Sequence, residues 1–290
     1  MRTRKEPDAA MDISVELIRA TVQLEQPAAD GKRTVGTGFL LNAPTPDGKP
    51  RTVLVTAAHV LKSMPGAEMK IGYRVQDATG AWRYRPQPVK IRQDGQELWI
   101  RSPDRDVAAI VVQAPAEFAQ AAIPLSWLAD GDAFERYSIG PGDEMMALGY
   151  PWGMSANGAG FPILRAGKVA SYPVAPSKQF PTFMLDFTVF PGNSGGPVFL
   201  SETVADEATG EARTVQLVAG VLTQELYGQN NERIGLGVVT QARFVRDTVA
   251  LLDSGPATAP PAVPAVAAAE QGAPTDAASG PVAPTFKPRP

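Results

Sequence analysis

The residue types limit the chemistry open to this chain, because its 290 residues include one histidine and no cysteine. A nucleophile must then be a hydroxyl, an amine or a carboxylate, and neither a disulfide nor a thiolate metal site can form. The histidine, His59, follows the apolar run VLVTAA, and Ser194 lies in the small-residue stretch FPGNSGGPVF at 190–199. An imidazole that accepts the hydroxyl proton makes serine a competent nucleophile. His59 and Ser194 are therefore the first candidate pair.

The order of the candidate residues distinguishes between two kinds of serine hydrolase. Gly192, Ser194 and Gly196 match G-x-S-x-G, the pattern of the nucleophile elbow in α/β-hydrolases. In that fold the histidine follows the serine, whereas His59 lies far upstream of Ser194. The order His, Asp, Ser is found on paired β-barrels. Taken singly, a histidine after a strand is more often structural, and a G-N-S-G-G run is more often a tight turn.

Composition and charge exclude several classes of partner. The net charge is −3 and the chain has no Lys/Arg-rich run, which argues against a nucleic-acid surface. No stretch of about 18 apolar residues predicts a membrane span, so membrane insertion is not expected. The opening segment lacks the apolar middle region of a signal peptide. A cytoplasmic location is therefore expected, with export by another route left open; the sequence leaves the oligomeric state unknown.

Short strands must position the candidate residues, because short apolar runs bounded by Gly, Pro, Asp or Asn recur along the chain. These runs include GTGFLLN, RTVLVTAA, MKIGYRV, VAAIVVQ, EMMALGYP, FMLDFTVF and TVQLVAGVLT. Long helical periodicity is scarce, which favours an all-β barrel or sandwich. The segment 114–142 contains several Pro and Gly residues and divides the strands into two groups. We interpret it as the connection between two barrels.

One helix and two disordered ends are also predicted. Phe244, Val245, Val249 and Leu252 lie on one face of a helix over about 240–252, which would close the globular part. From 254 to 290 the chain is rich in Pro and Ala and has too few large apolar residues to form a core. This tail is predicted to be disordered, as are residues 1–13.

Several motifs together resemble a known family. TAAHV and GNSGGP resemble the histidine and serine blocks of the trypsin-like (chymotrypsin-fold) serine peptidases. GTGFLL, RDVAAIVV, ALGYPWG, RAGKVAS and GLGVVT resemble further strands of that family, in the expected order over about 14–250. Several blocks in order are far less probable by chance than any one of them. The nearest resemblance is to the disulfide-free bacterial branch that includes the high-temperature-requirement proteases, but the Pro/Ala-rich segment follows where those have a PDZ domain.

The resemblance implies a fold and an activity. The fold would be all-β, with two six-stranded antiparallel β-barrels at about 14–125 and 140–240 and a C-terminal closing helix, in a peptidase domain over 14–250. The activity would be that of a serine endopeptidase that cuts a polypeptide substrate through an acyl-enzyme intermediate. No cofactor and no metal are expected.

The third member of the implied triad is one of two aspartates in SPDRDVAAIVV. Asp106 directly precedes the apolar strand and matches the family motif, so it is preferred over Asp104. Its carboxylate would accept the second imidazole N–H of His59 and stabilise the imidazolium formed during attack. The alternative is that Asp106 only caps a turn at the start of a strand, a common position for aspartate.

The stretch around Ser194 also implies an oxyanion hole. Glycine at 192 lets the chain turn so that the backbone N–H groups of Gly192 and Ser194 point at one oxygen. Asn193 replaces the aspartate that pairs with a newly cut N-terminal amine in the digestive enzymes. Activation by that ion pair is therefore not expected.

The implied substrate pocket carries no charge at its base. By family position Thr188 lies at the base, and one wall is formed by Leu222, Thr223 and Gln224. A neutral pocket predicts a preference for small or medium apolar side chains. Glu225 or Asp186 would change that preference if either pointed inward.

Two other functions are compatible with the same motifs. The chain could be a catalytically weak or inactive module that binds extended peptides by strand addition. It could also be an esterase of the same fold. A serine-reactive fluorophosphonate separates the inactive module from both enzymes, since only an activated Ser194 would form an adduct.

Overall fold

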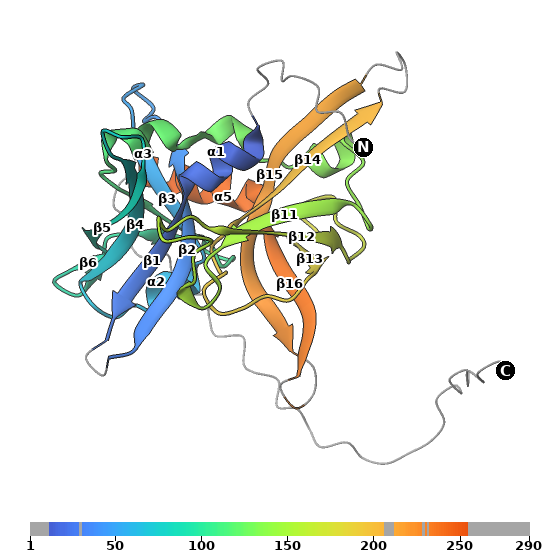
Figure 1. Ribbon diagram of the computed structural model, residues 1–290. Helices are drawn as coiled ribbons and strands as arrows, with labels where there is room; N and C mark the ends of the chain where they lie inside the picture. The colour runs from blue at the N-terminus through green and yellow to red at the C-terminus, as the bar shows by residue number, and fades with distance from the viewer. Residues whose placement is uncertain (1–11, 29–30, 206–211, 228–229, 231, 255–290) are drawn as a thin grey trace. The chain divides into compact units, whose positions relative to one another are not determined.

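The structure, a computed structural model, describes residues 12–28, 31–205, 212–227, 230 and 232–254 (Figure 1). Of the two segments predicted to be disordered, only residues 12, 13 and 254 fall among the described residues. Nearly all strands of the described chain belong to two mainly antiparallel sheets, and the candidate residues lie where the sheets meet.

The first sheet is formed by the N-terminal half of the chain. Its strands along the sheet are β5 (Trp82–Lys90), β4 (Glu68–Gln76), β1 (Thr21–Pro27), β2 (Arg33–Asn42), β3 (Thr52–Thr56), β9 (Ala108–Val111) and β8 (Ile100–Arg101). The short β10 (Ile123–Pro124) pairs with β2, and β6 (Arg92–Gln93) and β7 (Gln96–Glu97) form a separate hairpin. The inner face buries Val22, Leu24, Leu40, Leu54, Ile71 and Ile110.

This first sheet is open, which corrects the prediction of a closed six-stranded barrel. Closure needs a ladder of N–H and C=O groups between the two edge strands. The edge strand β5 contains Pro86 and Pro88, which have no N–H to donate, and most of its side chains are exposed. The opposite edge, β8, is two residues long. The strand edges therefore cannot form a continuous ladder.

The second sheet is a closed barrel, as predicted. Its six strands follow the order β11 (Glu144–Gly149), β12 (Ile163–Val169), β13 (Thr182–Asp186), β16 (Arg233–Gln241), β15 (Ala212–Tyr227) and β14 (Pro197–Ala205). The barrel closes where β14 pairs with β11, with Met146 opposite Phe199 and Ala147 opposite Val198. Every strand of the barrel therefore has two neighbours.

The connection between the two sheets contains short helical segments. It includes α3 (Ala116–Ala121), the 3₁₀ helix η1 (Leu125–Trp127) and α4 (Ala133–Arg136). Phe118 and Phe134 are both buried, the first in the core of the open sheet and the second in the core of the barrel. The segment 114–142 is thus packed against both sheets rather than extended between them.

A helix at the start of the described chain was not predicted. α1 (Ile13–Ala20) begins after Asp12, whose side chain accepts a hydrogen bond from the Ser14 N–H at 2.9 Å as an N-cap. Ile13, Leu17 and Ala20 are buried at helical spacing. Ile13 therefore belongs to the folded part, one residue earlier than the expected boundary.

The predicted closing helix is present. α5 (Ala242–Ala250) continues into a 3₁₀ turn at Leu251–Asp253 and buries Val245 and Val249. It contacts β9 of the open sheet and β15 and β16 of the barrel. Asp253 pairs with Arg51 beside β3, with 2.6 Å between Oδ1 and the guanidinium Nη1. The helix therefore connects the two sheets.

Candidate active site

The pairing of β3 with β9 places His59 beside Asp106. Thr56, the last residue of β3, lies opposite Ala108, the first residue of β9. His59 follows β3 by three residues in the short helix α2 (Ala58–Lys62), and Asp106 precedes β9 by two residues. One strand pair thus determines the positions of both side chains.

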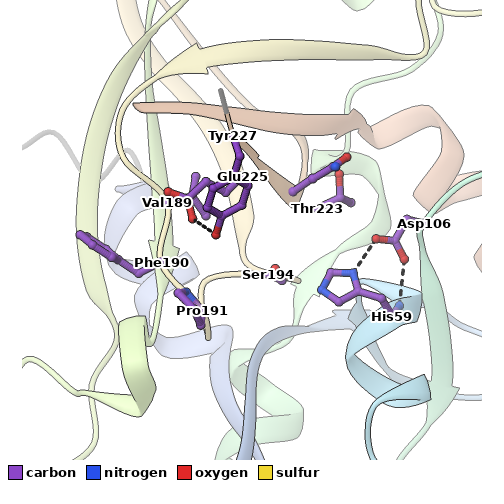
Figure 2. A pocket seen from close by; sticks show the side chains of 10 residues that line it. His59, Asp106, Val189, Phe190, Pro191, Ser194, Thr223, Glu225 and Tyr227 are labelled. Atoms are coloured by element: carbon purple, nitrogen blue, oxygen red, sulfur yellow. Dashed lines mark hydrogen bonds and ion pairs between the residues drawn. The ribbon is translucent and has the colours of Figure 1, made fainter. Parts of the chain in front are cut away.

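Asp106 makes two contacts with His59. Its Oδ2 lies 2.6 Å from the imidazole Nδ1, and its Oδ1 accepts the backbone N–H of His59 at 2.9 Å. The backbone N–H belongs to the first turn of α2, where amides have no partner within the helix. One carboxylate therefore orients both the ring and the start of the helix, and leaves Nε2 as the free ring nitrogen. Figure 2 shows the imidazole between Asp106 and Ser194.

Asp104 does not take part in this contact. Its side chain is 59% exposed, accepts the Ser102 hydroxyl at 3.2 Å and lies near the guanidinium of Arg105. The structure places Asp106, the aspartate preferred from the sequence, at His59.

The protonation of Asp106 follows from its neighbours. Burial acts to raise the pKa of this carboxyl, but the His59 ring and backbone N–H outweigh it, with a small contribution from Lys62. The net effect lowers the pKa of Asp106 below its ordinary value. The group is an acceptor at neutral pH, so the proton between Asp106 and His59 belongs to Nδ1.

The Ser194 loop joins β13 to β14 and is held by backbone hydrogen bonds to β15. The Gly195 N–H donates to the Leu222 carbonyl at 2.7 Å, and the Leu222 N–H donates to the Gly196 carbonyl at 2.9 Å. Ser194 is partly buried and lines the same pocket as His59. The junction of the loop with β14 and its hydrogen bonds to β15 thus determine where the Ser194 hydroxyl lies.

The loop forms a tight turn just before Ser194. The Asn193 N–H donates to the Phe190 carbonyl at 3.0 Å, with Pro191 and Gly192 between them. Gly192 has φ +97°, and proline followed by a glycine with positive φ is the signature of a type II turn. A Cβ at 192 would overlap the Tyr150 carbonyl, so no other residue fits.

The orientation of the peptide between Pro191 and Gly192 is fixed by a neighbouring loop. The Trp152 N–H donates to the Pro191 carbonyl at 2.6 Å. Because a trans peptide points its C=O and N–H in opposite directions, the Gly192 N–H points away from Trp152. Among the described residues, neither this N–H nor that of Ser194 has a protein acceptor. Two unpaired backbone N–H groups beside a serine hydroxyl can donate hydrogen bonds to a developing oxyanion.

Trp152 itself has an unusual backbone conformation, in the 3₁₀ turn Pro151–Gly153 (η2). Its φ is +54°, a left-handed value that costs a residue with a Cβ about 1 kcal/mol or more. The Trp152 ring is exposed, and the guanidinium carbon of Arg233 lies 5.6 Å from its centroid. The same guanidinium carbon lies 5.0 Å from the ring centroid of Phe190. The sequence motifs assign no role to Trp152, because a local sequence pattern cannot reveal such strain.

Thr37 links the open sheet to the Ser194 loop. Its N–H donates to the Ser194 carbonyl at 2.9 Å, and its hydroxyl donates to the Gly192 carbonyl at 2.6 Å. The same hydroxyl accepts the Tyr150 N–H at 3.1 Å. A Cβ at Gly195 would overlap the Thr37 carbonyl, so glycine permits this close approach. The GTGF motif marked the strand, but not this threonine.

A buried arginine supports the same region. Arg74 donates to the Tyr150 hydroxyl at 2.7 Å and to the Gly160 carbonyl at 3.1 Å, and it also bonds carbonyls at the end of α1. Burial lowers the pKa of Arg74 and raises the pKa of Tyr150 to about 12. Tyr150 therefore remains protonated and can donate to the Gly160 carbonyl, 3.0 Å away. The start of the Trp152 loop is thereby fixed to α1 and β4.

The pocket beside Ser194 has a volume of about 410 Å³. Thr223 and Gln224, which were predicted to form a wall, line it, whereas the predicted Thr188 and Leu222 lie outside the lining. Leu222 is 1% exposed and packs in the barrel core, and Thr188 presents its carbonyl to Arg165 at 2.6 Å. The full lining is His59, Asp106, Val189, Phe190, Pro191, Ser194, Thr223, Gln224, Glu225 and Tyr227.

Of the two acidic residues left open by the sequence, one lies in the pocket. Glu225 lines it from β15, as Figure 2 shows, and its side chain is 6% exposed. Asp186 is exposed at the end of β13 and is not part of the lining. The pocket therefore contains a carboxylate that the uncharged Thr188 does not predict.

The chain belongs to the trypsin-like peptidase domain family, which matches residues 36–204. This confirms the family predicted from the motifs. No curated protein matches the chain.

Several solved protease structures are similar to the chain. The protease Anisep from Arthrobacter nicotinovorans is 15% identical with a TM-score of 0.47, over 81% of this chain and 96% of that chain. The HtrA-type protease AlgW with a decapeptide is 15% identical with a TM-score of 0.47, over 84% and 68%. The thermostable serine protease AL20 from an extremophilic microorganism is 12% identical with a TM-score of 0.46, over 83% and 100%.

The described residues contain neither a membrane-spanning helix nor a cluster of metal-ligating side chains. None of the described helices is both long and apolar enough to cross a membrane. In the same part of the chain, no three His, Cys, Asp or Glu side chains gather where they could hold a metal ion.

Proposed function

We propose that this chain is a serine endopeptidase in which His59, Asp106 and Ser194 form the catalytic triad. The contact of Asp106 with His59 Nδ1 at 2.6 Å, in a pocket shared with Ser194, carries the proposal. The His59 side chain is 48% exposed, so a substrate can reach its free nitrogen. Membership of the trypsin-like peptidase domain family supports the same assignment.

The first half of the reaction acylates Ser194. Its Oγ attacks the substrate carbonyl carbon while His59 Nε2 takes the hydroxyl proton, and the negative charge of Asp106 stabilises the imidazolium. The tetrahedral oxyanion accepts hydrogen bonds from the N–H groups of Gly192 and Ser194, which have no acceptor among the described residues. His59 then gives the proton to the leaving amine, the C–N bond breaks, and an ester to Ser194 remains.

The second half reverses these roles with water. His59 takes a proton from water, the hydroxide equivalent attacks the ester carbonyl, and the same two N–H groups receive the second oxyanion. His59 returns the proton to Ser194 Oγ as the C–O bond breaks. The products are a carboxylic acid and the free enzyme, so no cofactor is needed.

A fluorophosphonate probe and an unfolded protein substrate test this proposal. We expect the probe to label Ser194, as mapped by mass spectrometry, and the unfolded protein to be cut into fragments. Labelling without cleavage of any peptide would favour an esterase of this fold. No labelling and no cleavage would favour an inactive peptide-binding module.

Replacement of the base gives a second test. His59→Ala should lower turnover by about 10⁶, because the base and the nucleophile act as a unit and the chain has no other histidine. Lys62→Ala, an exposed residue of the same helix, is the matched control and should remain active. Near-normal hydrolysis by a folded His59→Ala variant would refute the mechanism.

A further inference from the structure

The pocket beside Ser194 contains one acidic side chain besides Asp106, and its burial is unusual. Glu225 is 6% exposed, and the described lining residues include no lysine and no arginine. Placing a carboxylate away from water is costly unless hydrogen bonds or a cation compensate. The contacts of Glu225 therefore show whether the side chain is structurally satisfied.

Glu225 is only partly satisfied. The Tyr227 hydroxyl donates to Oε2 at 2.8 Å, which raises the pKa of Tyr227. Oε1 is buried and accepts no hydrogen bond from the described residues. A carboxylate offers about four lone-pair sites, so most of its acceptor capacity is unused.

The guanidinium of Arg233, which lies close to Glu225, does not donate a hydrogen bond to the free carboxylate oxygen. Arg233 Nε lies 3.7 Å from Oε1, which is too long for a hydrogen bond. The guanidinium is instead placed against the rings of Phe190 and Trp152. Arg233 thus offsets part of the charge of Glu225 without donating to it.

We propose that Glu225 is a specificity-determining residue that recognises a primary ammonium group, as in a lysine side chain, on the substrate residue preceding the cut bond. This inference rests on the proposed peptidase function. An ammonium has three donors, which can bond the Glu225 carboxylate and the Tyr227 hydroxyl together. The methylene stem of lysine would lie along Val189 and Pro191 of the pocket wall.

The pocket lined by Glu225 differs from the uncharged pocket that Thr188 predicts. A pocket selective for small apolar residues would have no use for a buried carboxylate with a free oxygen. A carboxylate that only stabilised the fold would be expected to have its acceptor sites filled by protein donors. The position of Glu225 in the pocket lining, together with acceptor sites that the described residues leave unfilled, is the observation that favours substrate recognition.

Two peptides that differ at one position test the proposal. One has lysine before the cut bond, and the other has norleucine, which has a similar straight chain without the ammonium. We expect kcat/KM to be about 10- to 100-fold higher for the lysine peptide, the range for hydrogen bonds to a charged group. Equal values for the two peptides would overturn the proposal.

Two variants identify the residue responsible. Glu225→Gln keeps the shape and removes the charge, and it should reduce the lysine preference to near one. Asp186→Asn removes the same charge from an exposed β13 residue outside the pocket, and it should leave the preference unchanged. A lysine preference that survives in folded Glu225→Gln would refute the role of Glu225. If that variant does not fold, the comparison of the two peptides on the unaltered protein still decides.

Binding to Ser194→Ala distinguishes failure of this inference from failure of the proposed function. By calorimetry, the lysine peptide should bind this variant at least about 10-fold more tightly than the norleucine peptide. Tight lysine-selective binding by Ser194→Ala, combined with cleavage of neither peptide by the unaltered protein, would support Glu225 and refute the peptidase. Equal cleavage of both peptides would do the opposite. Absence of binding by both peptides would overturn the role of Glu225.

Discussion

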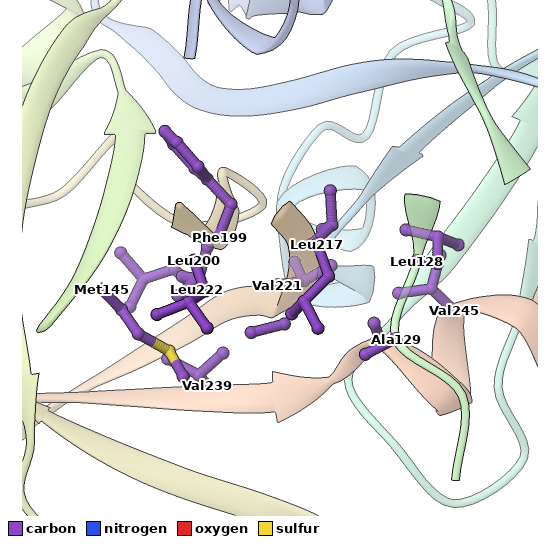
Figure 3. Packing of buried hydrophobic residues seen from close by; sticks show 14 of the residues in the cluster. Leu128, Ala129, Met145, Phe199, Leu200, Leu217, Val221, Leu222, Val239 and Val245 are labelled. Carbon is purple, nitrogen blue, oxygen red and sulfur yellow. The ribbon is translucent and has the colours of Figure 1, made fainter. Parts of the chain in front are cut away.

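The closed barrel and the open sheet contribute different groups to the same pocket. The barrel supplies Ser194, the turn with the two unpaired N–H groups, and Glu225. The open sheet supplies His59 and Asp106 from one corner, where β3 pairs with β9. The interior of the barrel is filled by buried side chains such as Met145, Phe199 and Val239 (Figure 3).

The groups supplied by the barrel and by the open sheet differ in how much of the surrounding sheet is needed to position them. The proposed oxyanion donors are backbone amides, so their positions depend on the path of the chain, and each barrel strand has two neighbours to hold it. The pair of His59 and Asp106 depends on one strand pair. The open edge, β5, is separated from β3 by β4, β1 and β2, so leaving it unpaired does not disturb the pair.

The largest effect is expected at the corner of the open sheet. Asp106→Asn should preserve the fold and lower turnover by about 10⁴, because an amide favours the wrong imidazole tautomer. Asp104→Asn, two residues earlier and 59% exposed, is the matched control and should cost far less. Both are measured with one peptide at pH 7. A larger loss from Asp104→Asn would transfer the role to Asp104.

A smaller effect is expected when the barrel's turn is disturbed. Gly192→Ala forces a Cβ against the Tyr150 carbonyl at φ +97° and should lower turnover by about 10²–10³, the usual cost of losing one oxyanion donor. Gly142→Ala is matched in backbone strain, with φ +95°, but has open space around it. It should reduce stability slightly and leave turnover unchanged. Equal losses of turnover in the two variants would mean that strain alone, not the turn beside Ser194, explains the effect.

His59 and Ser194 could be predicted from the sequence because their residue types and order are informative. One histidine placed before a G-N-S-G-G run leaves few other bases for a serine nucleophile. Residue type and order do not separate Asp106 from Asp104, because both precede the same strand; the preference for Asp106 rests on its position next to the strand and on the family motif. The register of Thr56 opposite Ala108, which only the folded sheet provides, places the Asp106 carboxylate at His59.

Other features were missed for different reasons. The open first sheet could have been anticipated, because Pro86 and Pro88 in one strand indicate an edge. α1 had a signal as well, in Asp12 followed by apolar residues at helical spacing. Glu225 and Asp186 were both named as acidic residues that could enter the pocket, but the sequence had no signal for which of them does, since a charged residue in a strand is normally expected at the surface.

The stability of the two sheets should also differ. Val239→Ala removes two carbons from a fully buried barrel position and should lower the free energy of unfolding by roughly 2 kcal/mol. Val89→Ala makes the same change in the partly buried edge strand β5 and should cost less than about 1 kcal/mol. Urea unfolding of both variants measures the difference. Equal costs would mean that β5 is held as firmly as the barrel strands.

The smallest effect is expected from the pH dependence of the Asp106 contact. The folded pKa of Asp106 lies below its ordinary value of 3.8, so the folded state binds this proton less readily than the unfolded chain does. Its ionised form therefore stabilises the fold above about pH 4, and this contribution is lost as the pH falls through the lower, folded pKa. The side chain is 37% exposed, so solvent screening keeps the effect small. The difference in melting temperature between the unaltered protein and Asp106→Asn, followed from about pH 6 to pH 2, should shrink only at the acid end. A difference that grows on acidification would show that the carboxylate is not held ionised by His59.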